Sequence, residues 1–363
     1  MNNSYATIKR WRVQIFAITW LAYAAFYFTR KAFSVAKLGI GEDPNFHLDK
    51  MAMANLDAIY LAAYAVGQFT WGILADRFGP RVVVLGGLII SALAALVMGT
   101  YATLPIFATC MLIQGLAQST GWSGLCKNIG SFFPAQQRGR VLGLWSSCYA
   151  FGGLVASPFA GWWAYTLIGS WHAAFISSAA VVALVAVLFF IFQRNTPQDV
   201  GLPAVEPEPD MSAEEIAAEK RISIWAPLRE IMRNRTVLTL GLAYFMLKPA
   251  RYAILLWGPV IVFEQMPSVG KVGAAIIPTS FELAGLLGPI LIGLASDKLF
   301  GARRMPACVI SLLALTISLA FFMGALHSGS VALVVALLFV MGLTLYGPDS
   351  MISGAAAIDF GTA

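Results

Sequence analysis

The sequence predicts an all-α, multi-pass membrane protein made of two helical bundles that are related by a pseudo-two-fold axis. Of its 363 residues, 59% are hydrophobic and only 12% are charged, whereas an average soluble domain carries about 25% charged residues. Long apolar runs recur along the chain, each near the roughly 20 residues that a helix needs to cross a bilayer. A charged motif also occurs twice, once in each half of the chain. Together these features indicate two sets of membrane-spanning helices.

Charged residues and Pro/Gly breaks divide the apolar runs into ten predicted helices. They cover residues 12–38, 51–76, 82–101, 104–131, 138–167, 171–193, 235–265, 272–297, 304–326 and 330–358. Only one connection is long, and its polar composition predicts a linker outside the bilayer. The predicted organisation is an N-terminal six-helix bundle (1–193), a cytoplasmic linker (194–234) and a C-terminal bundle with four helices (235–363).

The distribution of lysine and arginine predicts a cytoplasmic N-terminus, because cytoplasmic loops carry the excess of these residues. With that orientation most of the 24 basic residues lie in cytoplasmic segments, and the outer loops hold only Lys37, Lys50 and Lys271. The first apolar run is too long for the core of a signal peptide and lacks a clear small-residue cleavage site, so it predicts a retained spanning helix.

A short charged motif follows the second and the eighth predicted helix. Its copies are GILADRFGPR (72–81) and GLASDKLFGARR (293–304). Parallel repeats of this kind are typical of the two halves of major facilitator transporters. Ion pairs that form and break between cytoplasmic loops would make the motif a gate, and the alternative is a simple tether to the cytoplasmic face. The candidate gating or structural residues here are Asp76, Arg77, Arg81, Asp297 and Arg303.

Two arginines at membrane depth are the main candidates for a functional site. A charged side chain at the bilayer centre costs about 2.5–3.5 kcal/mol, so it usually faces a wet cavity or a partner. Arg30 and Arg251 lie almost equally far from the basic residue that begins each helix, so they reach nearly the same depth. Each lies in the first helix of its half, which predicts one site between the bundles.

Polar and aromatic residues line up on the same helix faces as these arginines. Tyr23, Tyr27 and Arg30 recur at intervals of three or four residues, which places them on one stripe. Each aromatic residue alone is better explained as an interfacial or packed core residue. Taken together they predict a lined cavity, whose members besides the two arginines are Tyr23, Tyr27, Lys31, Tyr64, Gln68, Tyr149, Lys248 and Tyr346.

A phosphate is the ligand that two arginines suit best. The planar guanidinium matches phosphate or carboxylate with two hydrogen bonds and keeps its charge. The alternative is that each arginine only pairs with an intramembrane carboxylate, and the candidates are Asp57, Glu282 and Asp349. Four cations near the site face these three acids, which leaves room for an anionic ligand.

The residue types that enzymes and cofactor proteins need are scattered. His47, His172 and His327 fall at helix ends or in outer loops, and the four cysteines form no Cys-x-x-Cys pair. We therefore expect no metal, no cofactor, no enzymatic activity and, without a basic patch on a soluble domain, no nucleic-acid partner.

Six stretches, in order along the chain, resemble the organophosphate:phosphate antiporters of the major facilitator superfamily, which include the bacterial glycerol-3-phosphate and hexose-phosphate transporters. They are YFTRKAFSVA (27–36), GLAQSTGWSGLCK (115–127), NTPQDVGLP (195–203), RYAILLWGP (251–259), FELAGLLG (281–288) and YGP (346–348). The resemblance implies exchange of an organic phosphate ester, glycerol 3-phosphate or a sugar phosphate, for inorganic phosphate by alternating access.

The resemblance also assigns residues. Arg30 and Arg251 match the family's phosphate-binding arginines, Lys31 matches the neighbouring lysine, and Glu282 matches an acid on helix 8. Pore-lining aromatic residues of the family are matched by Tyr23, Tyr27 and Tyr64. Two positions depart from the family: Gln68 replaces a lysine and Tyr149 replaces a histidine. Since Lys248 adds a cation near Arg251, we expect positive charge to have moved from helix 2 to helix 7.

The family has twelve helices, of which this chain contains ten, so the resemblance implies a fragment or truncated form that transports poorly unless the last two are supplied. The expected setting is the bacterial inner membrane, with the lipid bilayer as partner and the protein monomeric. Two alternatives remain: a phosphate-ester sensor of the same fold that signals to a membrane histidine kinase, and a permease for another organic anion.

Overall fold

The computed structural model describes residues 2–205, 233–300 and 304–352, and within these ranges the chain consists of helices joined by turns and loops. The first half contains α1 (Asn2–Ile40), α2 (Lys50–Phe78), α3 (Pro80–Thr100), α4 (Leu104–Gln118), α5 (Thr120–Phe132), α6 (Ala135–Trp145), α7 (Ser147–Gly161), the π-helical η1 (Trp162–Leu167), α8 (His172–Phe192) and the 3₁₀ turn η2 (Pro197–Val200). The second half contains α11 (Arg235–Gln265), η3 (Pro267–Val269), α12 (Gly270–Ile276), α13 (Thr279–Phe300), α14 (Arg304–His327) and α15 (Val331–Ser350). Most of the predicted linker and the end of the last predicted helix lie outside the described residues.

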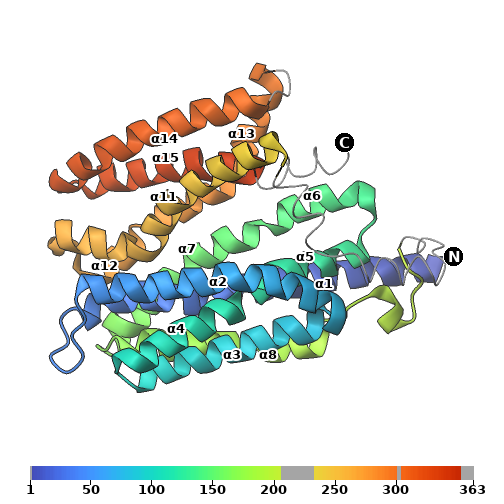
Figure 1. Ribbon diagram of the computed structural model, residues 1–363, viewed down its shortest axis with the longest axis horizontal. Coiled ribbons are helices and arrows are strands. Elements are labelled where there is room, and N and C mark those ends of the chain that lie inside the picture. Colours follow the sequence, from blue (N-terminus) through green and yellow to red (C-terminus); the bar gives the residue numbers. More distant parts are fainter. Residues whose placement is uncertain (1, 206–232, 301–303, 353–363) are drawn as a thin grey trace.

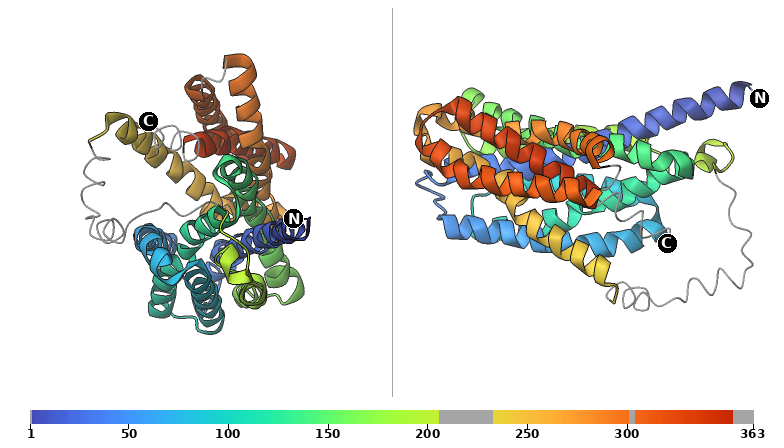
Figure 2. Two further views of the ribbon diagram at one scale, coloured as in Figure 1. Left: turned by 90° about the vertical axis from the view of Figure 1, so that its right-hand side faces the viewer. Right: turned by 90° about the horizontal axis from the view of Figure 1, so that it is seen from above.

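The long helices run side by side along the length of the molecule (Figures 1 and 2). In the first half, α1 packs against α7 and α8, α3 against α4 and α8, and α2 against α4; in the second, α15 packs against α13 and α14. The halves meet where α1 contacts α11 and where α7 contacts α12 and α13. Six helical stretches are long and apolar enough to cross a membrane, among them α3, α8, α14 and α15.

Three predicted helices are broken in the structure: 272–297 divides between α12 and α13, and two others divide at a serine. The predicted span 104–131 divides at Ser119 into α4 and α5, and the span 138–167 divides at Ser146 into α6 and α7. At both breaks serine hydroxyls donate to backbone carbonyls three or four residues earlier: Ser119 to Leu116, and Ser146 to Leu142. Such side-chain bonds compete with the helical ladder and bend it. The apolar pattern continues through the breaks, so it did not reveal them.

The two halves repeat one packing contact. A Cβ atom on Gly115 of α4 would lie 2.4 Å from the carbonyl oxygen of Tyr60 on α2, and one on Gly342 of α15 would lie 2.3 Å from that of Phe281 on α13. Only glycine permits backbones to approach so closely. The sequence interval from Tyr60 to Phe281 equals the interval from Arg30 to Arg251. The second and fourth helices of each half are therefore packed equivalently, as a pseudo-two-fold relation requires.

The loop between α1 and α2 marks one end of the molecule, which we call the loop end. Figure 1 shows this loop near α12, and the N-terminus at the opposite end, the N-terminal end. Asp43 organises the loop: its carboxylate accepts from the indole of Trp171 (2.7 Å) and from the amide of Asn45 (2.8 Å). These hydrogen bonds favour the ionised carboxylate and lower the pKa of Asp43, and the bond from the Trp171 indole has the largest effect.

Candidate functional site

Arg30 lies in the C-terminal third of α1, where it is 5% exposed. Its guanidinium carbon lies 4.5 Å from the ring centre of Tyr27, 5.0 Å from that of Tyr64 and 5.9 Å from that of Tyr60. Within the described part of the chain, no carboxylate lies within ion-pairing distance of Arg30, and its Nη2 has no hydrogen-bond partner. A buried cation is thus held by aromatic faces, and one of its buried donors, Nη2, has no hydrogen-bond partner among the described residues.

Gln118, the last residue of α4, fixes the orientation of Arg30. Its Oε1 accepts from Arg30 Nε (3.0 Å) and from the Tyr60 hydroxyl (2.7 Å). Its Nε2 donates to the hydroxyls of Thr29 (3.1 Å) and Ser91 (3.2 Å), which are themselves bonded to each other at 2.9 Å. The contact of Gln118 with Arg30 was not predicted from the sequence. Because every polar atom of the amide is used, the network leaves Gln118 one orientation.

Arg251 occupies the equivalent place on α11 and is 7% exposed. Its Nη1 lies 3.3 Å from an oxygen of Asp349, near the end of α15. The other oxygen of Asp349 accepts from Lys248 at 2.9 Å. The guanidinium carbon also lies 4.8 Å from the ring centre of Tyr346 and 4.9 Å from that of Tyr149. Unlike Arg30, Arg251 therefore already has an anionic partner.

Tyr27 brings the two arginines to one place. Its ring faces Arg30, and its hydroxyl accepts from Arg251 Nη2 at 3.4 Å. The structure thus joins two cations from opposite halves through a single tyrosine of α1.

Lys31 and Glu282 form the third charged contact of the site. Their charged atoms lie 3.6 Å apart, and both side chains are almost completely buried. Lys31 also donates to the carbonyl of Leu255 on α11 at 2.9 Å, and Glu282 accepts from the Tyr346 hydroxyl. The family acid on helix 8 is therefore paired with Lys31 rather than with Lys248.

The remaining predicted lining residues form an aromatic wall beside the arginines. Tyr149 stacks on Tyr346 with ring centres 5.9 Å apart. Tyr23 packs against Trp122 and Trp145, at 5.5 and 5.6 Å. Gln68 is half-buried on α2, and none of the described contacts joins it to either arginine.

Lys37 and Asp57 lie elsewhere than the sequence suggested. Lys37 was predicted in an outer loop, but it lies in the last turn of α1, fully buried and paired with Asp57. It also donates to the Leu256 carbonyl at 3.1 Å and lies 4.1 Å from a ring centre of Trp257. Because Asp57 pairs with Lys37, it is not a partner of the arginines. The four cations of the site therefore face two described carboxylates, Glu282 and Asp349.

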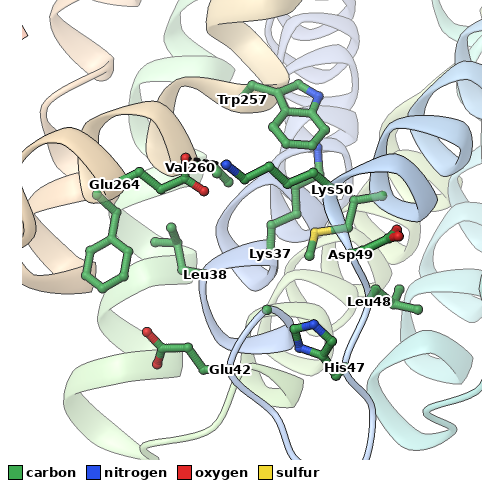
Figure 3. Close-up of a pocket in the computed structure, with 13 residues that line it drawn as sticks. Lys37, Leu38, Glu42, His47, Leu48, Asp49, Lys50, Trp257, Val260 and Glu264 are labelled. Atoms are coloured by element: carbon green, nitrogen blue, oxygen red, sulfur yellow. Dashed lines mark hydrogen bonds and ion pairs between the residues drawn. The ribbon is translucent and has the colours of Figure 1, made fainter.

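A cavity of about 400 Å³ opens beside Lys37 at the loop end (Figure 3). Lys50 and Glu264 form an ion pair of 2.7 Å at this cavity, which joins α2 to α11. A second ion pair, Glu42 with Lys271 (2.6 Å), joins the halves at the same end. This cavity is therefore separate from the paired arginines, and the ion pairs around it hold the halves together.

The predicted gating residues are described only in part. The side chains of Asp76 and Asp297 and the whole of Arg303 lie outside the described residues. Arg77 lies 5.5 Å from the ring centre of Phe78. Arg81 donates to the Phe190 carbonyl at the end of α8. Arg81 thus contacts its own half.

The described residues include no group of three or more His, Cys, Asp or Glu side chains that could hold a metal ion.

The fold is that of a helical membrane protein of two halves, with buried charged residues of both halves meeting between them. The family model described as Major Facilitator Superfamily matches residues 19–360, and the chain belongs to that superfamily. The chain is 29% identical to the "Probable hexose phosphate transport protein" of Chlamydia muridarum, over 96% of this chain and 78% of the relative. It is 26% identical to "Sugar phosphate exchanger 3" of Bos taurus, over 96% and 79%.

Among solved structures, a bacterial homologue of the human lysosomal transporter Spinster, in an inward-facing and unoccupied conformation, superposes with a TM-score of 0.75. The identity is 17%, and the match covers 94% of this chain and 75% of that one, so it shows the fold alone. The resemblance to organophosphate:phosphate antiporters and the expectation of a transporter rather than an enzyme are confirmed by the family and the relatives.

Proposed function

We propose that the chain binds organic phosphate esters and inorganic phosphate between its two halves and exchanges one for the other across the membrane. The observation that carries this proposal is the convergence of Arg30 and Arg251 on Tyr27, with one guanidinium lacking a carboxylate partner among the described residues. Each arginine can offer a phosphate a planar pair of donors. A transported anion thus contacts both halves at once.

The charges of the site suit a dianion. Four cations, Arg30, Lys31, Lys248 and Arg251, surround the site, and two carboxylates, Glu282 and Asp349, balance half of them. The excess of two positive charges matches a phosphate monoester, which carries about −1.5 to −2 at neutral pH. A neutral sugar or polyol would leave this excess unbalanced, so phosphate is the recognised group and the aromatic wall faces the organic part.

The proposed orientation has the N-terminus in the cytoplasm, because most of the basic residues of the sequence then fall in the predicted cytoplasmic segments. The loop end then lies outside, and its ion pairs close that face. The proposed setting is the bacterial inner membrane, with a monomeric chain whose bundles are residues 1–193 and 235–363, joined by the linker 194–234.

Alternating access follows if the two halves rock about the site. A phosphate held by both arginines favours the arrangement in which the halves are close. Only a ligand with differential affinity for that arrangement can shift the equilibrium toward it. Exchange then arises because the carrier reorients when loaded, and an organic phosphate and inorganic phosphate take turns.

Competition against radiolabelled inorganic phosphate tests the proposal on the purified 363-residue chain in lipid nanodiscs. We expect phosphate to bind and to be displaced by glycerol 3-phosphate, hexose phosphates or phosphoglycerate, and not by glycerol or glucose. Displacement by simple carboxylates but not by phosphate esters would indicate a permease for another anion and contradict the proposal.

Flux separates a carrier from a sensor. Proteoliposomes loaded with phosphate should take up labelled phosphate ester faster than empty ones, in a version of the chain extended to the length of its curated relative, of which this chain spans 78%. Tight binding without flux in that extended version would identify a sensor instead.

A further inference from the structure

The two arginines occupy equivalent positions but have different partners. Each receives its partner from the fourth helix of its own half: Arg30 from Gln118 at the end of α4, and Arg251 from Asp349 near the end of α15. Gln118 is neutral, whereas Asp349 is negatively charged, as a phosphate is. The two sides of the site are therefore unequal toward an incoming anion.

We propose that Asp349 is an internal counter-anion that a phosphate must displace from Arg251, so that Arg30 is the primary anchor and Arg251 a conditional one. This inference rests on the proposed function and names the residue that couples phosphate binding to contact between the halves. Until phosphate arrives, Asp349 neutralises Arg251. Once phosphate is bound at Arg30, it competes with Asp349 for the second arginine.

Lys248 makes the displacement possible. Asp349 is only 4% exposed, and an unpaired buried carboxylate is strongly unfavourable. Because Lys248 holds the other oxygen of Asp349 at 2.9 Å, the carboxylate remains paired after Arg251 turns to the phosphate. The Lys248 side chain is 23% exposed, which leaves it room to follow Asp349. Lys248 is thus a positioning residue for Asp349.

Arg251 is prepared for the exchange of partners. Its contact with Asp349 uses one nitrogen at 3.3 Å, longer than the 2.7–2.9 Å of a strong charge-assisted bond. Its Nε has no hydrogen-bond partner among the described residues. The faces of Tyr149 and Tyr346 support the guanidinium during the exchange. A bidentate phosphate would therefore replace a single, long contact.

Replacing Asp349 with asparagine tests the inference through the dissociation constant for inorganic phosphate. Asp349→Asn keeps the shape of the side chain and removes the competing charge, so phosphate should bind about tenfold more tightly, the scale of a hydrogen bond to a charged group. In an Arg251→Gln background the same change should have no effect. Unchanged or weaker phosphate binding in the Asp349→Asn chain would overturn the inference.

Lys248→Gln gives the second arm. In the wild-type background Lys248→Gln should weaken phosphate binding about tenfold, because Asp349 then stays paired with Arg251. In the Asp349→Asn background it should weaken phosphate binding by less than about twofold. An equal loss in both backgrounds would mean that Lys248 contacts phosphate directly, and the proposed role of Lys248 and Asp349 would be wrong.

An infrared difference spectrum of the wild-type chain, with and without phosphate, tests the inference without any substitution that could impair folding. In the wild-type chain with ¹³C-labelled aspartate, saturating phosphate should shift an aspartate carboxylate band, because Asp349 changes partners. No shift at saturation would overturn the inference while leaving phosphate transport intact. Failure of the wild-type chain to bind phosphate at all would instead overturn the proposed function.

Discussion

Arg30 shows how a membrane protein can bury a cation with no carboxylate paired to it among the described residues. Its guanidinium lies against three tyrosine rings and donates to Gln118. Desolvated cation–π contacts contribute about 2 kcal/mol or more, and a hydrogen bond to a charged group about 1.5–3 kcal/mol. These neutral contacts offset the cost of burial and leave the positive charge uncompensated, which is the property that an anion site requires.

Converting Gln118 to a carboxylate should disable this arrangement. Gln118→Glu keeps the acceptor for Arg30 and Tyr60 but gives Arg30 a partner of the same charge as phosphate. We expect the dissociation constant for phosphate to rise about tenfold or more, measured by equilibrium binding. Gln118→Met, which removes the acceptor without adding charge, is the control and should weaken binding less. Equal losses in both variants would show that orientation alone matters.

Asp43 leads to a pH prediction at the loop end. Because its folded-state pKa lies below the unfolded value of about 3.9, ionised Asp43 stabilises the loop above that value. This stabilisation is lost as the pH falls through the lower folded-state pKa. Asp43 also accepts from the Phe46 amide at 3.2 Å. Asp43→Asn should therefore speed hydrogen exchange at the Asn45 and Phe46 amides at neutral pH. The difference from wild type should disappear in acid; a difference that persists there would exclude this cause.

The residue types of the site could be predicted, but the pairing of charges could not. Arg30, Tyr27 and Arg251 stand out because polar residues at membrane depth need a reason. Partner choice depends on how helices rotate against one another, which a single sequence does not specify. Lys37 was therefore placed in a loop, and Asp349 was one of three possible partners until the structure set it between Lys248 and Arg251.

At the scale of elements, α11 is one of the helices that join the halves. Pro259 has no N–H group, so the carbonyl of Leu255 lacks its usual helical donor. Lys31 and Ser34 of α1 supply hydrogen bonds to that carbonyl instead, at 2.9 and 3.3 Å. Ser34 also donates to the Leu256 carbonyl at 2.8 Å. A helix break in one half thus becomes an attachment point for the other.

Restoring the missing donor should loosen this attachment. In Pro259→Ala the new N–H competes with Lys31 and Ser34 for the Leu255 carbonyl. We expect a longer and broader distance distribution between spin labels at Asn45 and Ser268, two exposed loop-end residues of opposite halves. Pro249→Ala on the same helix is the matched control, since no described contact joins the Phe245 carbonyl to the first half. Identical distributions for Pro259→Ala and wild type would refute this role of Pro259.

The sequence predicted the long elements well and their interruptions poorly. Apolar runs mark α3, α8, α14 and α15 because a helix that faces lipid must be continuously apolar. The breaks at Ser119 and Ser146 were missed because serine is tolerated inside helices, and whether its hydroxyl bends one depends on the surrounding packing. One of these breaks lies beside the proposed site, since Gln118, which binds Arg30, directly precedes it.

At the scale of the whole molecule, the described ion pairs between the halves are found at the site and at the loop end. Lys50 with Glu264 and Glu42 with Lys271 are exposed pairs, each worth about 0–1 kcal/mol, so they can open readily. Together with the carbonyl contacts of α11 they hold the loop end closed. With the proposed orientation, this is the arrangement in which a ligand would arrive from the cytoplasm.

The orientation can be tested by labelling single cysteines in cells. With the N-terminus cytoplasmic, a cysteine replacing Asn45 should react with a membrane-impermeant maleimide in intact cells, and one replacing Gln136 should react only after permeabilisation. Both positions are exposed. The parent chain, whose four native cysteines are buried or partly buried, serves as the background control. The reverse labelling pattern would contradict the assigned orientation.

The most direct test of the two-arginine site is to locate a bound anion. Tungstate is a tetrahedral dianion that scatters anomalously, and crystals of the chain soaked in it should give one strong peak within hydrogen-bonding distance of both Arg30 and Arg251. The Arg30→Gln chain should lose this peak. A peak that contacts only one arginine, or that lies instead beside Lys37 and Lys50 at the loop end, would contradict the account.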